Sequence, residues 1–370
     1  MTRSWGNALR AGVILAVASV VLLGASLAFG LPKWSVLDRN QFAFLPGTWF
    51  ASQLATVQYP SRTCLLVGAS VVREGFDSSK LKTEVPDVEF VNLATTGGWS
   101  PMEVIDIQSS ILAEQSKHFR CIIVGLDNFY LRNFTPDAYE LVTTNYISQL
   151  PATSLPSMVG LTQGVSNFKR VLARTIMPFG KHATDAQRWW RYGIYLAKKY
   201  FAPSTDVSNY ELFDGELKPA VQFMYENLPA QLDTSRKQTG DAIVKFDLEN
   251  PASYTGSGPQ QAFVRSMARL KAIADAVVIV RMPLTATYAR VEAAAEPSFN
   301  RAMKSAGVSR FIDCKMQSQK EEDVFFDTAH LNPVGRDMLS RSAGKAIDGL
   351  LGENRLELET SETCAVVEPS

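Results

Sequence analysis

Short apolar blocks alternate with longer amphipathic stretches over much of this chain. Each block ends in small, polar or turn-forming residues, which is typical of a buried strand that stops at a tight turn. The blocks predicted to form strands are CLLVGAS (64–70), VEFVNLATTGG (88–98), CIIVGLDN (121–128), VVIVRMPLT (277–285) and VSRFIDC (308–314).

The stretches between these blocks carry apolar residues at helical spacing and predict helices. Asp77 or Ser78 can cap the first helix, and Pro101 suits the first turn of the second, which extends to about residue 115. Further helices are predicted over 259–276, about 290–306 and 332–351. Strands that alternate with helices in this way predict a parallel sheet with helices on both faces, and therefore an α/β fold.

The alternation is interrupted after the third predicted strand, because residues 131–240 contain no further apolar block of this kind. We interpret about 136–240 as an insertion in a domain that spans 62–352. The tail, 353–370, is polar and acidic and is predicted to be disordered.

Residues 11–31 contain no charged side chain and are long enough, as a helix, to cross the roughly 30 Å hydrocarbon core of a membrane. Arg3 and Arg10 precede this run. The positive-inside rule therefore places residues 1–10 in the cytoplasm and sends the main domain to the periplasm or the extracellular space. The small residues that end at Ala28 also suit a cleavable signal peptide, and this alternative stays open.

The 37 basic and 37 acidic residues balance, which argues against a nucleic-acid-binding protein. The four cysteines match no zinc-site spacing, and no metal or cofactor is expected. Cys64 and Cys121 each begin a predicted strand and could face each other across neighbouring strands. We interpret them as buried free thiols, because a disulfide requires their Cα atoms to lie within about 7 Å.

One of the three histidines, His330, follows a carboxylate at a spacing that suggests catalysis. It lies in the stretch VFFDTAHLNPVG, three residues after Asp327. A carboxylate in this place can fix the tautomer of an imidazole and stabilise the imidazolium, as acyl transfer by an activated hydroxyl requires. His118 and His182 have no such companion. The pair therefore predicts a hydroxyl nucleophile elsewhere in the chain.

The carboxyl ends of parallel strands are where α/β proteins bind ligands, so the nucleophile is expected there. Ser70 ends the first predicted strand, Gly97 follows the second, and Asp127 and Asn128 end the third. Ser70 could attack an acyl carbon, while the backbone N–H groups of Ser70 and Gly97 and a side-chain amide stabilise the oxyanion.

Four segments resemble, in the same order, the sequence blocks of the SGNH or GDSL hydrolases. These segments are GAS (68–70), NLATTG (92–97), GLDN (125–128) and DTAHLNPVG (327–335). The resemblance covers 62–135 and about 240–352. It implies a flavodoxin-like three-layer sandwich with Ser70 as nucleophile, His330 as base and Asp327 as the carboxylate that orients the base. It also implies Ser70, Gly97 and Asn128 as oxyanion donors.

The first and third blocks depart from the family pattern. Strict spacing puts Asp127, not Asn128, at the position of the family's asparagine, and an ionised carboxylate would repel a developing oxyanion. Either Asn128 points into the site, or Asp127 is held protonated, or this oxyanion donor is missing. In the first block Ala69 replaces an acidic residue, which is tolerable because Asp327 supports the base.

The predicted anchor, together with the stretches GASVVREGFD and RMPL, resembles the membrane-tethered family members that act in alginate O-acetylation and teichoic acid D-alanylation. This resemblance implies an exported, membrane-tethered serine esterase or O-acyltransferase. Its substrate would be an ester-bearing carbohydrate polymer of the cell envelope or a secreted polysaccharide, and its partner a multi-spanning membrane acyltransferase. The alternative is a non-catalytic protein of this fold that binds an envelope polymer or such an acyltransferase.

Overall fold

The computed structural model describes residues 50, 53–95, 101–131, 232–249, 257–315, 320–352 and 364–367. The predicted anchor 11–31, most of the predicted insertion and Gly97 lie outside these ranges. Within them, no helix is both long enough and apolar enough to span a membrane.

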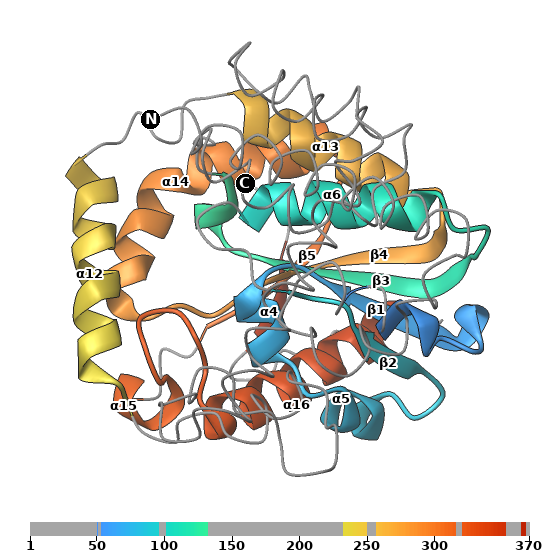
Figure 1. The fold of residues 1–370 in the computed structure, drawn as a ribbon, viewed down its shortest axis with the longest axis horizontal. Coiled ribbons are helices and arrows are strands. Elements are labelled where there is room, and N and C mark those ends of the chain that lie inside the picture. Colours follow the sequence, from blue (N-terminus) through green and yellow to red (C-terminus); the bar gives the residue numbers. More distant parts are fainter. Residues whose placement is uncertain are drawn as a thin grey trace, which may run out of the picture.

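A mixed, mostly parallel sheet forms the centre of the described residues (Figure 1). Its strands are β1 Thr63–Val67, β2 Glu89–Asn92, β3 Phe119–Leu126, β4 Ala274–Arg281, β5 Phe311–Cys314 and β6 Cys364–Val367. They lie in the order β2-β1-β3-β4-β5-β6. Strands β1 to β5 are parallel, and β6 runs antiparallel to β5. The predicted α/β class is confirmed.

Helices cover both faces of this sheet (Figure 1). One face carries α6 Pro101–Ala113, α13 Ser257–Lys271 and α14 Ala286–Ser305. The other carries α4 Ser70–Gly75, α5 Ser78–Glu84 and α16 Pro333–Leu351. At one end, α12 Thr234–Glu249 lies beside α14, and the short helix α15 Glu321–Val324 precedes α16. Two 3₁₀ turns, η1 Pro60–Arg62 and η2 Asn128–Leu131, flank β1 and β3.

Successive side chains of β1 enter two separate hydrophobic cores. Leu65 and Val67 pack among the side chains of α6 and α13. Cys64 and Leu66 point to the other face and pack among those of α4, α5 and α16. Because both faces are buried, the strand is apolar from Cys64 to Val67, which is why the sequence shows a continuous apolar block and no alternation.

Two of the helices begin at side-chain caps. The Asp77 carboxylate accepts hydrogen bonds from the N–H groups of Ser79 and Lys80 at the start of α5. The Asn332 amide oxygen accepts from Val334 and Gly335, at 2.9 and 3.0 Å, at the start of α16. Both interactions satisfy backbone donors that a helix leaves unpaired in its first turn. The predicted starts of these helices are confirmed.

The boundary between α13 and β4 differs from the prediction. The helix ends at Lys271 and the strand begins at Ala274, whereas the apolar pattern placed this change at residue 277. The cause is tertiary, because Ala274 and Ala276 pair in register with Phe119 and Cys121 of β3. Strand pairing thus overrides the helical preference of this alanine-containing stretch.

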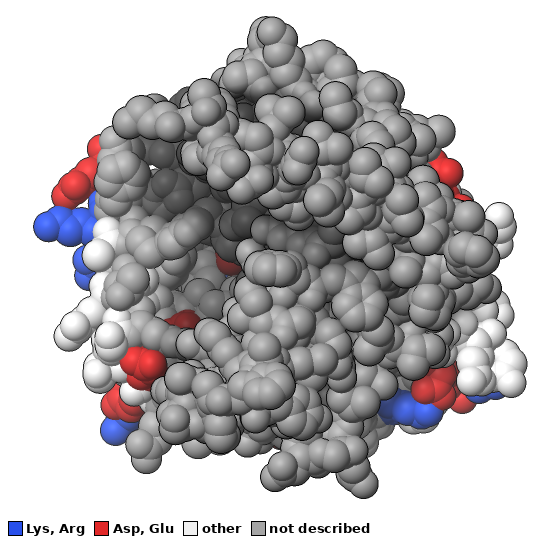
Figure 2. All heavy atoms as spheres, viewed as in Figure 1, with Lys and Arg blue, Asp and Glu red and all other residues white. Residues whose placement is uncertain are grey.

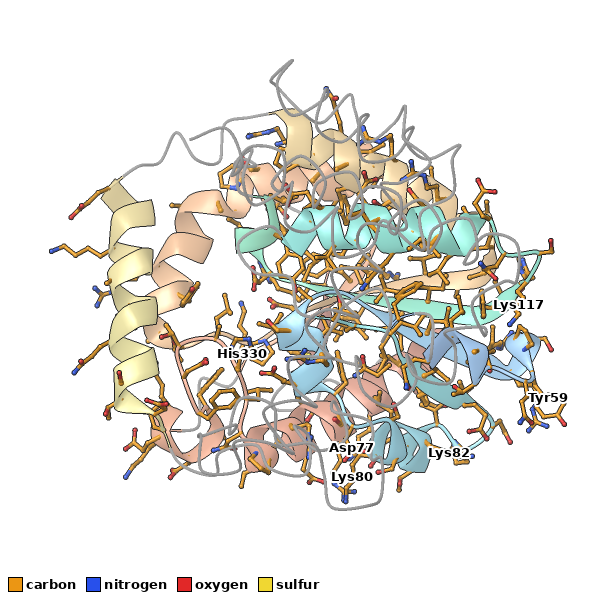
Figure 3. All side chains as sticks on the ribbon, viewed as in Figure 1. Tyr59, Asp77, Lys80, Lys82, Lys117 and His330 are labelled. Atoms are coloured by element: carbon orange, nitrogen blue, oxygen red, sulfur yellow. A yellow bond between two sulfur atoms is a disulfide. The ribbon has the colours of Figure 1, made fainter. Side chains whose placement is uncertain are left out.

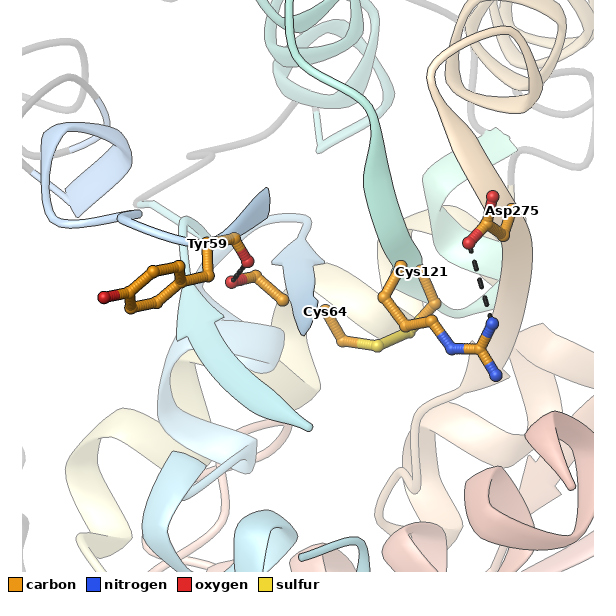
Figure 4. Close-up of a disulfide and its surroundings, with 6 residues drawn as sticks. Tyr59, Cys64, Cys121 and Asp275 are labelled. Atoms are coloured by element: carbon orange, nitrogen blue, oxygen red, sulfur yellow. Dashed lines mark hydrogen bonds and ion pairs between the residues drawn. A yellow bond between two sulfur atoms is a disulfide. The ribbon is translucent and has the colours of Figure 1, made fainter. Parts of the chain in front are cut away.

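The cysteines form two disulfides, so the prediction of free thiols at Cys64 and Cys121 is wrong. These two residues are direct partners in the parallel pairing of β1 with β3, and their Cα atoms lie 4.4 Å apart (Figure 4). The register places both side chains on the same face of the sheet, within the range that a disulfide requires. In the described residues no cysteine is free.

The second disulfide joins Cys314 of β5 to Cys364 of β6, with Cα atoms 4.1 Å apart. It corrects the prediction of a wholly disordered tail, because Cys364–Val367 forms a four-residue strand on the edge of the sheet. Residues 353–363 lie outside the described ranges. The polar composition of the tail concealed a segment that is held by a covalent link and an antiparallel ladder.

Charges of both signs lie next to each other on the surface of the described residues (Figure 2). Asp337 on α16 contacts Lys80 at 3.3 Å and Arg341 at 3.0 Å, for example. Such exposed pairs contribute little to stability. Their mixture of signs agrees with the balanced composition of the chain.

Candidate active site

A tight turn between β1 and α4 presents Ser70 at the carboxyl end of the strand. Gly68 has φ of 152°, and a Cβ there would meet Val72 Cγ2 at 2.5 Å and the Gly125 carbonyl oxygen at 2.8 Å. Only glycine therefore suits this position. Gln108 of α6 holds the turn, because its side chain accepts from the Gly68 N–H at 3.0 Å and donates to the Gly68 carbonyl at 3.2 Å.

Asp327 and His330 lie in the loop between α15 and α16. One Asp327 oxygen, Oδ1, accepts hydrogen bonds from the backbone N–H groups of Ala329, at 2.9 Å, and His330, at 2.8 Å. The loop is closed further by the His330 carbonyl, which accepts from the Phe326 N–H at 3.0 Å. The Asx-type turn explains why a spacing of three residues brings the carboxylate to the imidazole.

The structure brings Ser70, His330 and Asp327 into one hydrogen-bonded relay. His330 Nδ1 lies 2.9 Å from Asp327 Oδ2, and His330 Nε2 lies 2.8 Å from Ser70 Oγ. Figure 3 shows His330 in the region between its loop and α4. The imidazole also stacks on Phe326, with ring centroids 5.6 Å apart. Two segments separated by 260 residues in the sequence thus meet at a single ring.

The electrostatics favour an ionised Asp327 and a basic His330. Burial would raise the pKa of Asp327, but its hydrogen bond and charge interaction with His330 and two backbone N–H groups hold that pKa below its ordinary value. Burial would lower the pKa of His330, but Glu74 and Asp327 raise it above its ordinary value against the opposing charge of Arg73. Because a carboxylate only accepts, Nδ1 carries the proton and Nε2 accepts from the Ser70 hydroxyl.

The helix α12 supports this loop from outside. Thr328, between Asp327 and His330, donates from its hydroxyl to the Lys237 carbonyl of α12 at 2.9 Å. Its own carbonyl accepts from the Thr285 hydroxyl, at 2.7 Å, at the start of α14. A Cβ on Gly240 would lie 2.1 Å from the Thr328 hydroxyl oxygen, so α12 and the loop pack without a gap.

Of the predicted oxyanion donors, the Ser70 backbone is the one that the structure places. Within the described part of the chain, no group accepts a hydrogen bond from the Ser70 N–H. Gly97 lies outside the described residues, and so does the side chain of Asn128, which begins η2. Asp127 is buried at the end of β3, 3% exposed, and its carbonyl accepts from the Tyr130 N–H. The choice between Asp127 and Asn128 stays a prediction.

Sequence reasoning missed two charged residues beside the relay. Arg73 and Glu74 are buried in α4 and form an ion pair. Glu74 Oε2 lies 3.8 Å from His330 Nε2. The sequence did contain a spacing that points to Glu74, because it is four residues after Ser70 and residues at this spacing share a helix face. The prediction treated GAS as the end of a strand and did not include a helix at Ser70–Gly75.

No protein-family model matches this chain, and no curated protein does. Within the described ranges, no cluster of three or more His, Cys, Asp or Glu side chains is suited to hold a metal ion.

Proposed function

We propose that this chain is a serine esterase or O-acyltransferase that works through an acyl-serine intermediate. The observation that carries the proposal is the relay from Asp327 through His330 to Ser70, with donor and acceptor distances of 2.9 and 2.8 Å. A hydroxyl at the mouth of a parallel sheet, with a base and an orienting carboxylate in line, is the arrangement that activates serine for acyl transfer.

The proposed reaction has two half-reactions. In the first, the Ser70 Oγ–H proton moves to His330 Nε2 while Oγ bonds to the acyl carbon, and the Ser70 N–H stabilises the oxyanion. The ester C–O bond then breaks, and the leaving oxygen takes the proton from Nε2. In the second, water or a sugar hydroxyl gives its proton to Nε2 and attacks the acyl carbon, and Ser70 Oγ leaves with that proton. Water gives an esterase and a sugar hydroxyl gives a transferase.

The fold supports the same proposal. The strand order β2-β1-β3-β4-β5 is that of flavodoxin-like proteins, whose ligands bind where the order reverses, between β1 and β3. Ser70 follows β1 at this point, and Asp127 and Asn128 follow β3. This topology, the sequence blocks and the relay together favour an SGNH-type hydrolase with a three-layer core.

Two features support a location outside the cytoplasm. Disulfides persist mainly in oxidising compartments, and both disulfides of this chain are buried. The uncharged run 11–31 would supply a membrane anchor with the N-terminus in the cytoplasm. A tethered, exported acyl-transfer protein would act on a carbohydrate polymer of the cell envelope, together with a multi-spanning membrane acyltransferase.

The second candidate function is binding without chemistry, and Asp127 favours it. By strict sequence spacing, the buried carboxylate of Asp127, directly after β3, falls at the position of the family's asparagine, where it would repel an oxyanion. In this case the domain would hold an envelope polymer or an acyltransferase in place.

Hydrolysis of p-nitrophenyl acetate by the full chain in detergent separates the two candidates. Ser70→Ala is expected to lower the rate at least about 10³-fold, because the nucleophile is lost. Ser78→Ala is the matched control, since Ser78 also begins a helix, α5. Equal rates for Ser70→Ala and the unaltered protein would rule out the enzyme. Addition of an oligosaccharide acceptor, with detection of its acetylated form, then distinguishes transferase from esterase.

A further inference from the structure

Glu74 lies one helical turn after Ser70 and faces the same imidazole nitrogen. Its carboxylate oxygen is 3.8 Å from His330 Nε2, which also accepts from Ser70 Oγ at 2.8 Å. The Glu74 side chain is 6% exposed, whereas that of His330 is 24% exposed. Solvent therefore screens this pair far less than a surface ion pair. The helix that supplies the nucleophile thus also supplies a carboxylate to the base.

Arg73 fixes the place of this carboxylate. The guanidinium of Arg73 forms a buried ion pair with Glu74, and the Arg73 carbonyl accepts from the Asn92 side chain at 3.3 Å. In the described part of the chain, the charged groups that shift the pKa of His330 are Asp327 from its own loop and Glu74 and Arg73 from α4. Arg73 opposes the two carboxylates, but the net effect keeps the pKa of His330 above its ordinary value.

We propose that Glu74 is a positioning residue that stabilises the His330 imidazolium at Nε2, while Asp327 does so at Nδ1. The inference rests on the proposed function and deepens it. An imidazolium forms in both half-reactions, each time Nε2 has taken a proton. Once Ser70 is acylated, its Oγ has no proton to share with Nε2. Among the described residues, Glu74 is then the charged side chain that faces this nitrogen, so it keeps the ring in place while the acceptor arrives.

Imidazole titration by NMR tests the contact without reference to activity. The chain has only three histidines, and His330→Gln identifies the signal of His330. In the full chain, Glu74→Gln is expected to lower the pKa of His330, because a negative charge near the imidazolium is removed. Arg73→Gln is the matched control with the opposite sign, since it removes a nearby positive charge. A purely structural role for the Arg73–Glu74 pair predicts no such opposition.

The pH dependence of kcat/KM for p-nitrophenyl acetate tests whether the contact between Glu74 and His330 affects catalysis. In Glu74→Gln the acidic limb is expected to move to lower pH, with kcat about 10-fold lower and KM unchanged. This loss is a fraction of the roughly 10²- to 10⁴-fold that general acid–base catalysis provides. Glu74→Asp, which keeps the charge, is expected to restore part of kcat and guards against a folding defect in Glu74→Gln.

Two results would overturn the inference. One is an unchanged His330 titration in Glu74→Gln, and the other is a changed titration with an unchanged kcat and pH profile. Failure of the proposed function is distinguishable, because it appears as undiminished hydrolysis by Ser70→Ala and leaves the titration of His330 as it is.

Discussion

Two carboxyl groups of this protein, the partly buried Asp327 and the fully buried Glu103, have pKa values shifted in opposite directions. Asp327 in the relay accepts from two backbone N–H groups and from the His330 ring, and its pKa is lowered. Glu103 in α6 is 0% exposed, and no other residue in the described part of the chain donates to either of its oxygens. Burial raises its pKa well above the ordinary value, and only its own backbone N–H lowers it. The donors to Asp327 thus offset its partial burial, whereas Glu103 is more deeply buried and has no donor from another described residue.

The neighbour of Glu103 shows how strong burial is in the contact between α6 and α13. Asp106 has Arg269 at 2.7 Å and Arg265 at 3.5 Å, and the Ser266 hydroxyl donates to it at 3.3 Å. Burial nevertheless raises its pKa, against both arginines. Asp327 differs because it is less deeply buried and accepts hydrogen bonds from the His330 ring and from two backbone N–H groups of its own turn. At Asp327 the hydrogen bonds therefore outweigh partial burial and lower the pKa, whereas at Asp106 deeper burial outweighs the nearby cations and raises it.

Asp327→Asn removes the carboxylate whose pKa is lowered, and it is expected to have the largest effect of the substitutions considered. An amide can donate as well as accept, so it no longer fixes the proton on Nδ1, and kcat is expected to fall about 10⁴-fold. Hydrolysis of p-nitrophenyl acetate measures the effect. Asp337→Asn is the control, because that carboxylate is 40% exposed and lies in a surface pair with Arg341. A loss smaller than 10-fold in Asp327→Asn would show that other contacts orient the ring.

Gly240→Ala tests whether α12 maintains the geometry of the relay. The new methyl group would meet the Thr328 hydroxyl oxygen at 2.1 Å and push the Asp327–His330 loop towards α4. A displacement of about 1 Å costs up to roughly 10²-fold in rate, so kcat is expected to fall by about that factor. Alanine also favours a helix by about 1 kcal/mol over glycine, which offsets lost stability.

Gly344→Ala in α16 is the matched control for this effect. Its methyl group would meet the Glu84 Cβ at 2.8 Å, in a contact that lies outside the relay. It is expected to lower the melting temperature without lowering kcat. If Gly240→Ala is folded by circular dichroism and its kcat is unaltered, then α12 does not maintain the geometry of the relay.

Glu103→Met is expected to have the smallest effect of these substitutions, and it should improve a property of the protein, namely its stability. It removes a buried carboxyl group that lacks donors, so the free energy of unfolding is expected to rise by about 1 kcal/mol at neutral pH. Urea denaturation measures it. The pKa of Glu103 is raised in the folded state. Its contribution to the free energy of unfolding is therefore fully present below the pKa that the group has in the unfolded chain, and it is lost as pH rises through the pKa of the folded state. The gain in Glu103→Met should therefore grow with pH.

Asp106→Asn, on the same face of α6 as Glu103, is expected to change stability in the opposite direction from Glu103→Met. It removes the charge that pairs with Arg269 and Arg265 and leaves two partly buried cations. The free energy of unfolding is expected to fall. Equal responses to the two substitutions would mean that Glu103 has partners comparable to those of Asp106.

The sequence predicted the elements that depend on local pattern. The buried strands, the capped starts of α5 and α16, and the proximity of Ser70 to Asp327 and His330 follow from apolar blocks, capping residues and the rule that parallel strands end at one edge. The start of β4 at Ala274 and the Cys64–Cys121 bond did not follow, because both depend on the register between strands. Spacing along a chain does not determine that register.

Glu74 and the pairing of Cys364 were missed for a different reason. Glu74 matters through a helical turn in α4 that the apolar block concealed, and Cys364 lies in a segment whose composition resembles a solvated tail. Gly97, Asn128 and the anchor 11–31 lie outside the described side chains, and their roles stay predictions.

The sequence separation of 260 between Ser70 and His330 also determines when, during synthesis of the chain, the relay can form. At roughly 5 to 20 residues per second, the ribosome delivers the base about 13 to 52 s after the nucleophile, so no shorter chain can carry the relay. The Cys64–Cys121 disulfide spans only 57 residues, and both of its cysteines precede His330, so this bond can close within that interval. Cys364 follows His330 in the chain, so the second disulfide closes later. The covalent link between β1 and β3 can therefore form before the hydroxyl is activated, and the serine lacks its base until His330 has been made.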